Sequence, residues 1–342
     1  MQNFSETLIN WYNANKRTLP WRTTKDPYCI WLSEIILQQT RVDQGLPYYL
    51  KFIELFPTVF HLANASEEEV LNAWKGLGYY SRARNLKKSA EIVVNDLNGI
   101  FPKNFKDLLS LKGVGEYTAA AVASFCYNEK VAVVDGNVYR VLARLYNLST
   151  PIDTGVGKKE FKQLANELIS EKDPATFNQA IMEFGALQCV PKNPSCSECP
   201  FVVECQAKRS NLLNQLPVKS KKIKRRNRYF NYLVISKNDS FAVEKRTGKD
   251  IWEQLFQFPL LESKQKLYDP YLIQKKAEET FGLKDDIMME GDYKKHVLSH
   301  QDVYYAFWRT TSAGSLKFDF YEKKKLEELP FPKLLENYIS NL

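Results

Sequence analysis

The stretch of sequence that decides the fold is Leu111–Ala123, which is LKGVGEYTAAAVA. The glycines at positions 113 and 115 allow a sharp turn, and the small residues after Tyr117 favour a closely packed helix. We therefore predict a helix, a tight turn and a second helix. Lys112, Gly113 and Gly115 are candidate phosphate-binding residues, because the N–H groups at a helix N-terminus attract anions. Tight helix connections also use this turn without any ligand, so the motif alone leaves both interpretations open.

A second motif, VVDGNV at Val133–Val138, follows along the chain. It places Asp135 directly before an expected helix, where an aspartate can accept hydrogen bonds from the first N–H groups of that helix. Taken alone, this position favours an N-cap over a catalytic role.

Four cysteines follow, at Cys189, Cys196, Cys199 and Cys205, with the spacing C-x6-C-x2-C-x5-C in a proline-rich segment. Four thiolates in one short loop can converge on a single metal centre. Zinc sites usually pair their cysteines in two close knuckles, and only one such knuckle is present here. The spacing therefore favours an iron–sulfur cluster over zinc. We expect disulfides less, because we see no secretory segment and the two other cysteines stand alone in apolar runs.

A chain of 342 residues with 44% hydrophobic residues is long enough for two domains, each with its own core. No apolar stretch is long enough to span a bilayer, and the N-terminus enters a helical pattern that Ser5 could cap. These features predict a protein of the reducing cytoplasm.

The net charge of +8 is concentrated in one segment. Nine lysines and arginines lie between Lys208 and Arg228 without any acidic residue, and they account for the whole positive excess. This segment also contains Pro217 and separates two differently patterned halves. It is compatible with a solvated linker and with a contact to a polyanion.

Residues 1–206 have the periodicity of helices. The strongest segments are 28–39, 67–74, 84–97, 115–127, 136–146, 158–170 and 175–188. From residue 229 the pattern changes to strands rich in aromatic and β-branched residues at 229–235 and 302–308, with one helix at about 270–281 between them. We predict an all-α domain with its metal loop (1–206, the loop at 189–205), a basic linker (207–228) and an α+β domain (229–342).

Several blocks in this order resemble the helix-hairpin-helix DNA glycosylase superfamily and, within it, the MutY-type adenine glycosylases. The blocks are Pro20–Arg22 (PWR), Trp31–Thr40 (WLSEIILQQT), Gly76–Arg84 (GLGYYSRAR) and Phe177–Ala180 (FNQA), together with the hairpin, the VVDGNV motif and the four cysteines. The resemblance covers nearly all of residues 1–206. It implies a [4Fe-4S] cluster held by the four cysteines, and double-stranded DNA as the partner.

The resemblance also implies roles for individual residues. Glu34 would be the general acid at the adenine and would later handle water, Asp135 would stabilise the cationic sugar, and Asn137 would orient Asp135. Tyr117 would line the pocket. Trp21, Arg22 and Gln179 match positions around adenine, whereas Gln39 and Tyr79 match positions that wedge into the duplex beside 8-oxoguanine.

The residues themselves support a proton donor at Glu34. Its neighbours Trp31, Leu32, Ile35, Ile36 and Leu37 are apolar, an environment that favours the neutral carboxylic acid. Raising the pKa of a glutamate from about 4.3 to about 6 costs only about 2 kcal/mol, which burial can supply. Cleavage of an N-glycosidic bond needs such an acid and a second, ionised carboxylate near the sugar.

Position 117 separates two related activities. Bifunctional glycosylase/lyases of this superfamily, such as endonuclease III, carry a lysine there, which forms a Schiff base. Tyr117 cannot form an imine, so we expect hydrolysis by water and an intact abasic site as the product.

The second half resembles the Nudix (MutT-like) domain at the C-terminus of this family. Ser299 and His300 match a loop that reaches 8-oxoguanine, but Leu298 stands where the family has phenylalanine, and Gln254 replaces a glycine in a nearby turn. The Glu-rich array that binds Mg²⁺ in true Nudix hydrolases is incomplete. We therefore expect a recognition module without hydrolytic activity.

The predicted protein is a monomeric, monofunctional adenine DNA glycosylase, acting on adenine opposite 8-oxoguanine or guanine in the bacterial cytoplasm at the nucleoid. Two alternatives stay open: a bifunctional enzyme of the endonuclease III type and a catalytically silent iron–sulfur DNA-binding protein.

Overall fold

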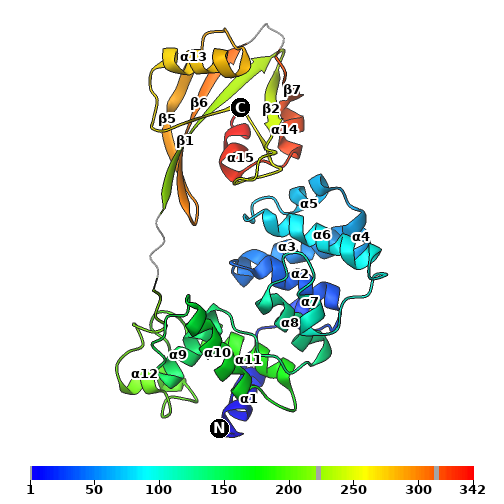
Figure 1. The fold of residues 1–342 in the computed structure, drawn as a ribbon, viewed down its shortest axis with the longest axis vertical. Coiled ribbons are helices and arrows are strands. Elements are labelled where there is room, and N and C mark those ends of the chain that lie inside the picture. The colour runs from blue at the N-terminus through cyan, green and yellow to red at the C-terminus, as the bar shows by residue number, and fades with distance from the viewer. Residues whose placement is uncertain (1, 221–224, 312–315) are drawn as a thin grey trace. The chain divides into compact units, whose positions relative to one another are not determined.

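The computed structural model describes residues 2–220, 225–311 and 316–342. Contacts divide the chain into two compact units. The first contains Met1–Asn64 and Asn85–Lys222, and the second contains Ala65–Arg84 and Ile223–Leu342. The predicted fold class is confirmed: a helical region is followed by a region built on a sheet (Figure 1).

The helical region follows the periodicity of the sequence closely. Its α-helices are α1 (Gln2–Asn15), α2 (Pro27–Leu37), α3 (Val42–Leu55), α4 (Val59–Asn64), α5 (Glu67–Ala73), α6 (Ser81–Asn95), α7 (Phe105–Leu108), α8 (Glu116–Tyr127), α9 (Gly136–Tyr146), α10 (Gly155–Leu168), α11 (Pro174–Leu187) and α12 (Gln206–Arg209). Two 3-10 helices, η1 (Pro20–Arg22) and η2 (Cys196–Glu198), complete it. Each of the seven expected helical segments overlaps one of these helices. Ser5 is not the cap we expected, because α1 already begins at Gln2.

Two groups of helices frame the first unit. The helices α1, α9, α10 and α11 share a core built around Leu142, Phe161 and Phe184, which are at most 1% exposed. The helices α2, α3, α7 and α8 pack on one another in a second group. The segments that carry Glu34 (α2) and Asp135 (before α9) therefore come from different groups.

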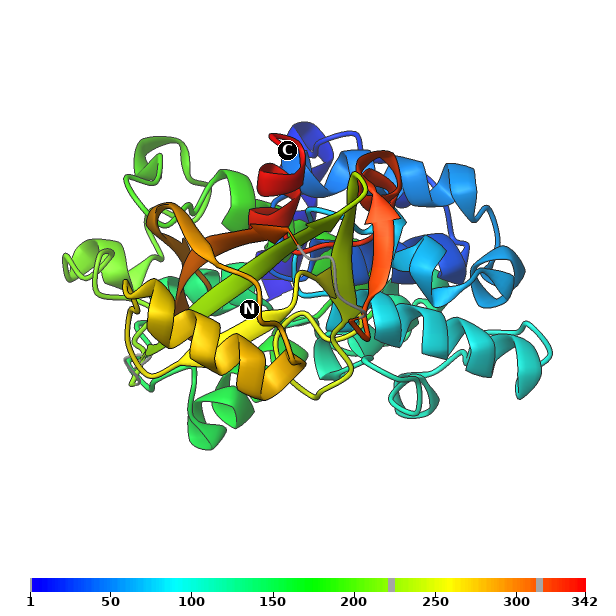
Figure 2. The ribbon, with the colours of Figure 1, turned by 90° about the horizontal axis from the view of Figure 1, so that it is seen from above.

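The second unit contains a mixed sheet with helices on both faces (Figure 2). Its strands are β1 (Arg226–Lys237), β2 (Ser240–Lys245), β3 (Phe256–Gln257), β4 (Leu260–Ser263), β5 (Met288–Val297), β6 (Gln301–Thr311) and β7 (Asp319–Glu322). The strand order is β3-β2-β1-β6-β5, with β4 paired to β1 and β7 to β2. The central strands β1 and β6 are parallel, from Arg226 opposite Gln301 to Ser236 opposite Thr311.

Side chains alternate along β1 between the two faces of the sheet, as the two-residue period of a strand requires. Phe230 and Val234 pack in a core with α14 (Lys323–Glu328) and α15 (Lys333–Ile339). Leu233 and Ile235 pack on the other face with α13 (Pro270–Phe281), which has the bounds that the sequence predicts.

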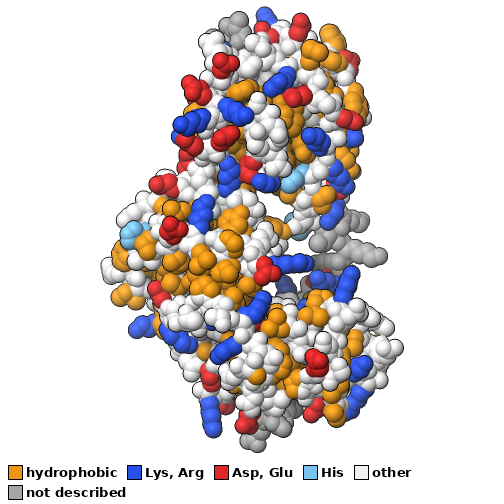
Figure 3. All heavy atoms as spheres, turned by 180° about the vertical axis from the view of Figure 1, so that it is seen from behind, with side chains coloured by type: hydrophobic (Ala, Val, Ile, Leu, Met, Phe, Trp, Pro, Cys, Tyr) orange, Lys and Arg blue, Asp and Glu red, His pale blue; other side chains and the backbone are white. Residues whose placement is uncertain are grey.

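The basic segment is more than a solvated linker. Arg228 is only 7% exposed, and its guanidinium contacts the carboxylates of Glu262 (2.6 Å) and Asp250 (2.7 Å). These two acids hold the charge of Arg228 inside the second unit. Lys221, Lys222 and Lys224 lie outside the described residues. Elsewhere, basic and acidic side chains intermingle, and apolar side chains gather between them, on the face that Figure 3 shows.

Candidate active site

The helix–turn–helix unit forms as the sequence predicts. The turn between α7 and α8 contains Gly113 in the left-handed region (φ +77°), where a Cβ would lie 2.7 Å from the Cβ of Asn85. Glycine is therefore required at this position. Gly115 differs, because it has extended backbone and open space around it. It is the N-cap of α8 without any side-chain cap, so the first N–H groups of this helix face no capping side chain.

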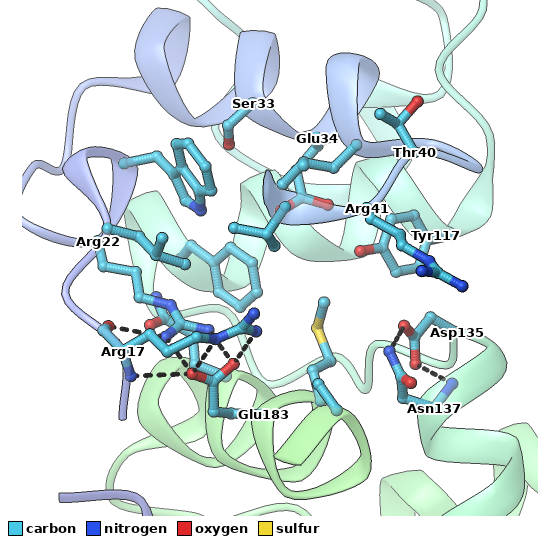
Figure 4. Close-up of a pocket in the computed structure, with 18 of the residues that line it drawn as sticks. Arg17, Arg22, Ser33, Glu34, Thr40, Arg41, Tyr117, Asp135, Asn137 and Glu183 are labelled. Atoms are coloured by element: carbon cyan, nitrogen blue, oxygen red, sulfur yellow. Dashed lines mark hydrogen bonds and ion pairs between the residues drawn. The ribbon is translucent and has the colours of Figure 1, made fainter. Parts of the chain in front are cut away.

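An open pocket of about 620 Å³ lies in the first unit between the two helix groups (Figure 4). Eight of the predicted site residues line it: Trp21, Arg22, Glu34, Gln39, Tyr117, Asp135, Asn137 and Gln179. They come from η1, α2, α8, α9 and α11 and from the turns next to them. The fold thus brings together residues that lie far apart in the sequence.

Glu34 enters the pocket from α2, and its residue is only 5% exposed. Burial raises the pKa of its carboxyl group to about 7, the nearby Tyr117 hydroxyl opposes this rise, and the charge of Asp135 adds to it. Glu34 thus keeps its proton up to neutral pH, as a general acid must. The same burial raises the pKa of Tyr117 well above its usual range, so the phenol stays neutral.

Asp135 faces the same pocket from the start of α9. It is the N-cap predicted from the sequence: Oδ1 accepts hydrogen bonds from the N–H groups of Asn137 and Val138, both at 2.8 Å. Oδ2 accepts a third, from the Asn137 amide (2.8 Å). Burial raises the pKa of Asp135, and these three hydrogen bonds oppose the rise. Both oxygens act as acceptors, as in an ionised carboxylate. The capping and catalytic interpretations of Asp135 are therefore compatible.

Asn137 is itself held in place by Arg140. The Arg140 guanidinium donates to Asn137 Oδ1 (2.8 Å), which turns the amide nitrogen toward Asp135. The same guanidinium donates to the carbonyls of Gly185 (2.7 Å) and Cys189 (2.8 Å). One buried arginine thus connects the aspartate to α11 and to the first cysteine of the metal loop.

Gln179 is oriented in a similar way. The buried Tyr12 hydroxyl on α1 donates to Gln179 Oε1 (2.6 Å), so the amide nitrogen of Gln179 is left for other partners. The Tyr12 ring also lies under the Arg22 guanidinium, 5.6 Å from its centroid.

The sequence did not reveal five charged residues of this pocket: Arg17, Arg41, Asp43, Arg140 and Glu183. Glu183 is buried on α11, and its carboxylate accepts hydrogen bonds from the guanidinium groups of Arg17 (2.6 and 2.9 Å) and Arg22 (2.8 and 2.9 Å). Burial alone would raise the pKa of Glu183, but these hydrogen bonds outweigh it and lower the pKa to about 2. An acid on an amphipathic helix gives no sign of this arrangement, because its partners lie about 160 residues away in sequence.

Replacing Glu183 by glutamine is expected to destabilise the first unit by about 3–5 kcal/mol, because it leaves two guanidinium groups next to each other without their shared charge partner. Urea unfolding at neutral pH measures this loss. Glu167→Gln on the exposed side of α10 is the matched control and is expected to change the free energy of unfolding by about 0.5 kcal/mol or less. Equal values for both variants would contradict the prediction.

The remaining predicted DNA-binding residues lie outside this pocket. Lys112, Gly113 and Gly115 are in the hairpin turn, and Ser299 and His300 follow β5 in the second unit. The Tyr79 and Ser299 hydroxyl groups, both within the second unit, are hydrogen-bonded to each other. Tyr79 (φ +50°) and Gln39 (φ +57°) have left-handed backbone, which is uncommon outside glycine and often found at functional positions.

Leu298 and Gln254 are the two positions where the second unit departs from the family pattern. The Leu298 side chain packs against the core formed by β1 and α15, so its apolar character is used inside the second unit. Gln254 adopts φ +68°, a left-handed conformation that a glycine would adopt without strain.

The four cysteines surround a common space. Cys189, Cys196, Cys199 and Cys205 line one small pocket near α9 and α11, and all four thiols are free. Arg144 of α9, 1% exposed, donates to the Cys189 sulfur (3.5 Å) and to the Val190 carbonyl (2.8 Å).

Within the described ranges, no group of three or more histidine, cysteine, aspartate or glutamate side chains is arranged to hold a metal ion. Four free thiols and the Arg144 guanidinium nevertheless line this one pocket, and this set of donors is compatible with a metal cluster.

Comparison with known families agrees with this geometry. Residues 32–171 match the HhH-GPD superfamily of base excision DNA repair proteins, and residues 231–341 match the NUDIX domain. A solved thermostable thymine-DNA glycosylase is 32% identical, with a TM-score of 0.57 over 61% of this chain and 96% of that one. An endonuclease III in a DNA complex shares the fold at 21% identity, with a TM-score of 0.53 over 62% of this chain and 97% of that one. The fold and the pocket therefore define a helix-hairpin-helix DNA glycosylase.

Similar curated proteins show which family of DNA glycosylases the chain belongs to. The adenine DNA glycosylase of Buchnera aphidicola subsp. Baizongia pistaciae is 39% identical over 75% of this chain and 73% of its own length. The adenine DNA glycosylase of Arabidopsis thaliana is 37% identical over 74% of this chain and 46% of its own length. That of Homo sapiens is 41% identical over 60% of this chain and 41% of its own length. The chain belongs to the adenine DNA glycosylase family of base excision repair enzymes. In its described part, no helix has the length and hydropathy needed to cross a membrane.

Proposed function

We propose that this enzyme hydrolyses the N-glycosidic bond of adenine paired with 8-oxoguanine or guanine in duplex DNA and leaves the abasic site intact. The observation that supports this most is the pair of carboxylates, one neutral and one ionised, that face one pocket from α2 and α9. Cleaving a bond to a poor leaving group next to a sugar needs this combination of acid and anion.

The reaction begins once the adenosine has left the helical stack and entered the pocket. Glu34 donates its proton to a ring nitrogen of adenine, and the electron pair of the C1′–N9 bond leaves with the base. The sugar becomes an oxocarbenium ion, which the negative charge of Asp135 stabilises. Water then adds at C1′, and the Glu34 carboxylate takes up the proton that this water releases. The products are adenine, the abasic sugar and an enzyme in its starting protonation state.

Other residues position these groups. Asn137, fixed by Arg140, keeps Asp135 oriented, and Trp21, Arg22 and Gln179 hold the base. Tyr117 contributes a neutral hydroxyl and no amine, so no imine forms and the strand is not cleaved. Lys112, Gly113 and Gly115 bind a backbone phosphate at the uncapped start of α8.

The second unit reads the base opposite adenine. The hydrogen bond between Tyr79 and Ser299 supports a joint role for the two hydroxyl groups at that base, with His300 beside them. A purine with the extra N7–H and 8-oxo groups of 8-oxoguanine presents a donor and an acceptor that guanine lacks.

The four cysteines would hold a [4Fe-4S] cluster, which would cross-link the end of α11, the metal loop and the start of α12. Purified protein is then expected to contain iron and acid-labile sulfide. Cys199→Ser would lose much of both, whereas Cys29→Ser, a cysteine outside the loop, would retain them.

The deciding experiment uses end-labelled duplexes with adenine opposite 8-oxoguanine, guanine or thymine, incubated with enzyme and analysed with and without hot alkali. Strand breaks that appear only after alkali, and only for the first two duplexes, are the expected result. Breaks without alkali would show a bifunctional enzyme of the endonuclease III type. Intact strands in every sample, from protein that contains its cluster, would indicate a silent DNA-binding protein.

A further inference from the structure

A second pocket of about 620 Å³ lies in the first unit beside the active site, between α8, α9 and α10. Tyr117 lines both pockets, with the active site on one side and this second groove on the other. The walls of the groove include Glu116 from the hairpin end of α8, Tyr139 from α9, and Lys158, Lys159 and Lys162 from α10. None of these three lysines has a role in the reaction described above.

The lysines differ in how their charges are used. Lys162 pairs with Glu116 at 2.8 Å, and both side chains are partly exposed. Lys158 and Lys159 are exposed on the first turns of α10, and no ion pair with either is found among the described residues. The first turn of α10 also carries no acidic residue. The groove is thus lined by three lysines and one acid, Glu116, so its lining has an excess of positive charge.

We propose that this groove binds the phosphate backbone of the adenine-bearing strand, next to the nucleotide in the active site. The proposal rests on the proposed function, since it takes the adenosine to occupy the pocket of Glu34 and Asp135. A strand is continuous, so the phosphate that follows a flipped nucleotide must leave the pocket along its rim. On the side of Tyr117, that path leads into the lysine groove.

The chemistry of the groove favours a backbone over a small anion. Its cations are exposed and flexible lysines rather than the buried, fixed arginine forks that bind a single phosphate or carboxylate with high specificity. Such lysines contact successive phosphates and contribute affinity without reading sequence. The groove would thus fix the position of the strand while the pocket selects the base.

The test compares Lys158→Ala/Lys159→Ala with the wild-type enzyme in binding a duplex that contains the mispair. Each lost phosphate contact is expected to reduce the slope of log K against log salt by about 0.9, or by up to about 1.8 for the double variant. Affinity should fall by about tenfold at low salt and by less at high salt. The single-turnover excision rate constant at saturating enzyme should stay within about twofold of wild type, because neither lysine touches the base.

The control is Lys275→Ala/Lys276→Ala, which removes two adjacent, exposed lysines from α13 and makes the same change in net charge. A slope unchanged from wild type, or lowered equally by both double variants, would overturn the proposal. The binding measurement does not depend on catalysis. If the wild-type enzyme binds the duplex but excises nothing, the proposed function fails while the groove is still tested.

A second arm identifies the strand. Methylphosphonates, which are uncharged, replace phosphates next to the adenosine or at the matching positions of the complementary strand. On the proposal, neutralising the adenine-bearing strand abolishes the difference between wild type and the Lys158→Ala/Lys159→Ala variant. If the difference disappears only when the complementary strand is neutralised, the strand assignment is wrong.

Discussion

Glu34→Gln is expected to lower the single-turnover rate constant for adenine excision by about 10²–10⁴-fold, the usual contribution of a positioned general acid. Glutamine has nearly the same shape but carries no proton that it can give to the base. Binding should change little below pH about 7, because the Glu34 side chain is buried in the pocket wall and carries its proton there in the free enzyme. Excision at saturating enzyme and binding of the same duplex are measured in parallel. Unchanged excision would remove Glu34 from the mechanism.

The raised pKa of Glu34, about 7, also predicts a pH dependence with a definite sign. The rate constant for excision should be flat below pH about 7 and fall above it, as the acid loses its proton. For stability, the folded state binds this proton more tightly than the unfolded state, so the free energy of unfolding falls as pH rises from about 4.5 to 7. The loss amounts to about 3 kcal/mol. In Glu34→Gln this part of the pH dependence should be absent, so equal pH profiles of stability would contradict the assignment.

Asp135→Asn is expected to lower the excision rate constant by about 10²–10³-fold or more, because the oxocarbenium ion loses the one negative charge that α9 places in the pocket. Asparagine caps a helix about as well as aspartate, so the free energy of unfolding should change by less than about 1 kcal/mol. The excision rate constant and the free energy of unfolding are therefore both measured for this variant.

Asp173→Asn provides the matched control. Asp173 caps α11 through a hydrogen bond from the Thr176 N–H (3.0 Å), and it does not line the pocket. Its replacement should leave the excision rate constant unchanged. A comparable loss of excision in both variants would mean that helix capping, and not the charge at C1′, explains the effect at Asp135.

The helices and the central strands were predictable because periodicity reports directly on which face of an element is buried. The same principle explains α13, whose bounds agree with the prediction. The grouping of residues 65–84 with the second unit was not predictable, since it depends on contacts between segments far apart in the chain. The ion pairs of Arg228 were not predictable for a related reason: composition identifies a charge, but not the acids that pack against it.

Within the candidate site, sequence motifs singled out eight residues that the fold brings together in one pocket. The motifs could not show how those residues are held. Glu183, and Tyr12 behind Gln179, lie at ordinary helical positions, and Arg17 lies between α1 and η1. Their contacts become recognisable only when α1, η1 and α11 are packed together. The lysines of the groove are equally ordinary in sequence, since a charged residue on a helix is usually only solvated.

The Glu183 carboxylate, which pairs with both Arg17 and Arg22, affects which bases the pocket can bind. Two guanidinium groups against one carboxylate leave that wall with a surplus of one positive charge. A neutral purine can lie against this wall, because its ring nitrogens can accept hydrogen bonds from the guanidinium groups. A purine that is alkylated at a ring nitrogen carries a fixed positive charge, and we expect it to bind less well against this wall than neutral adenine.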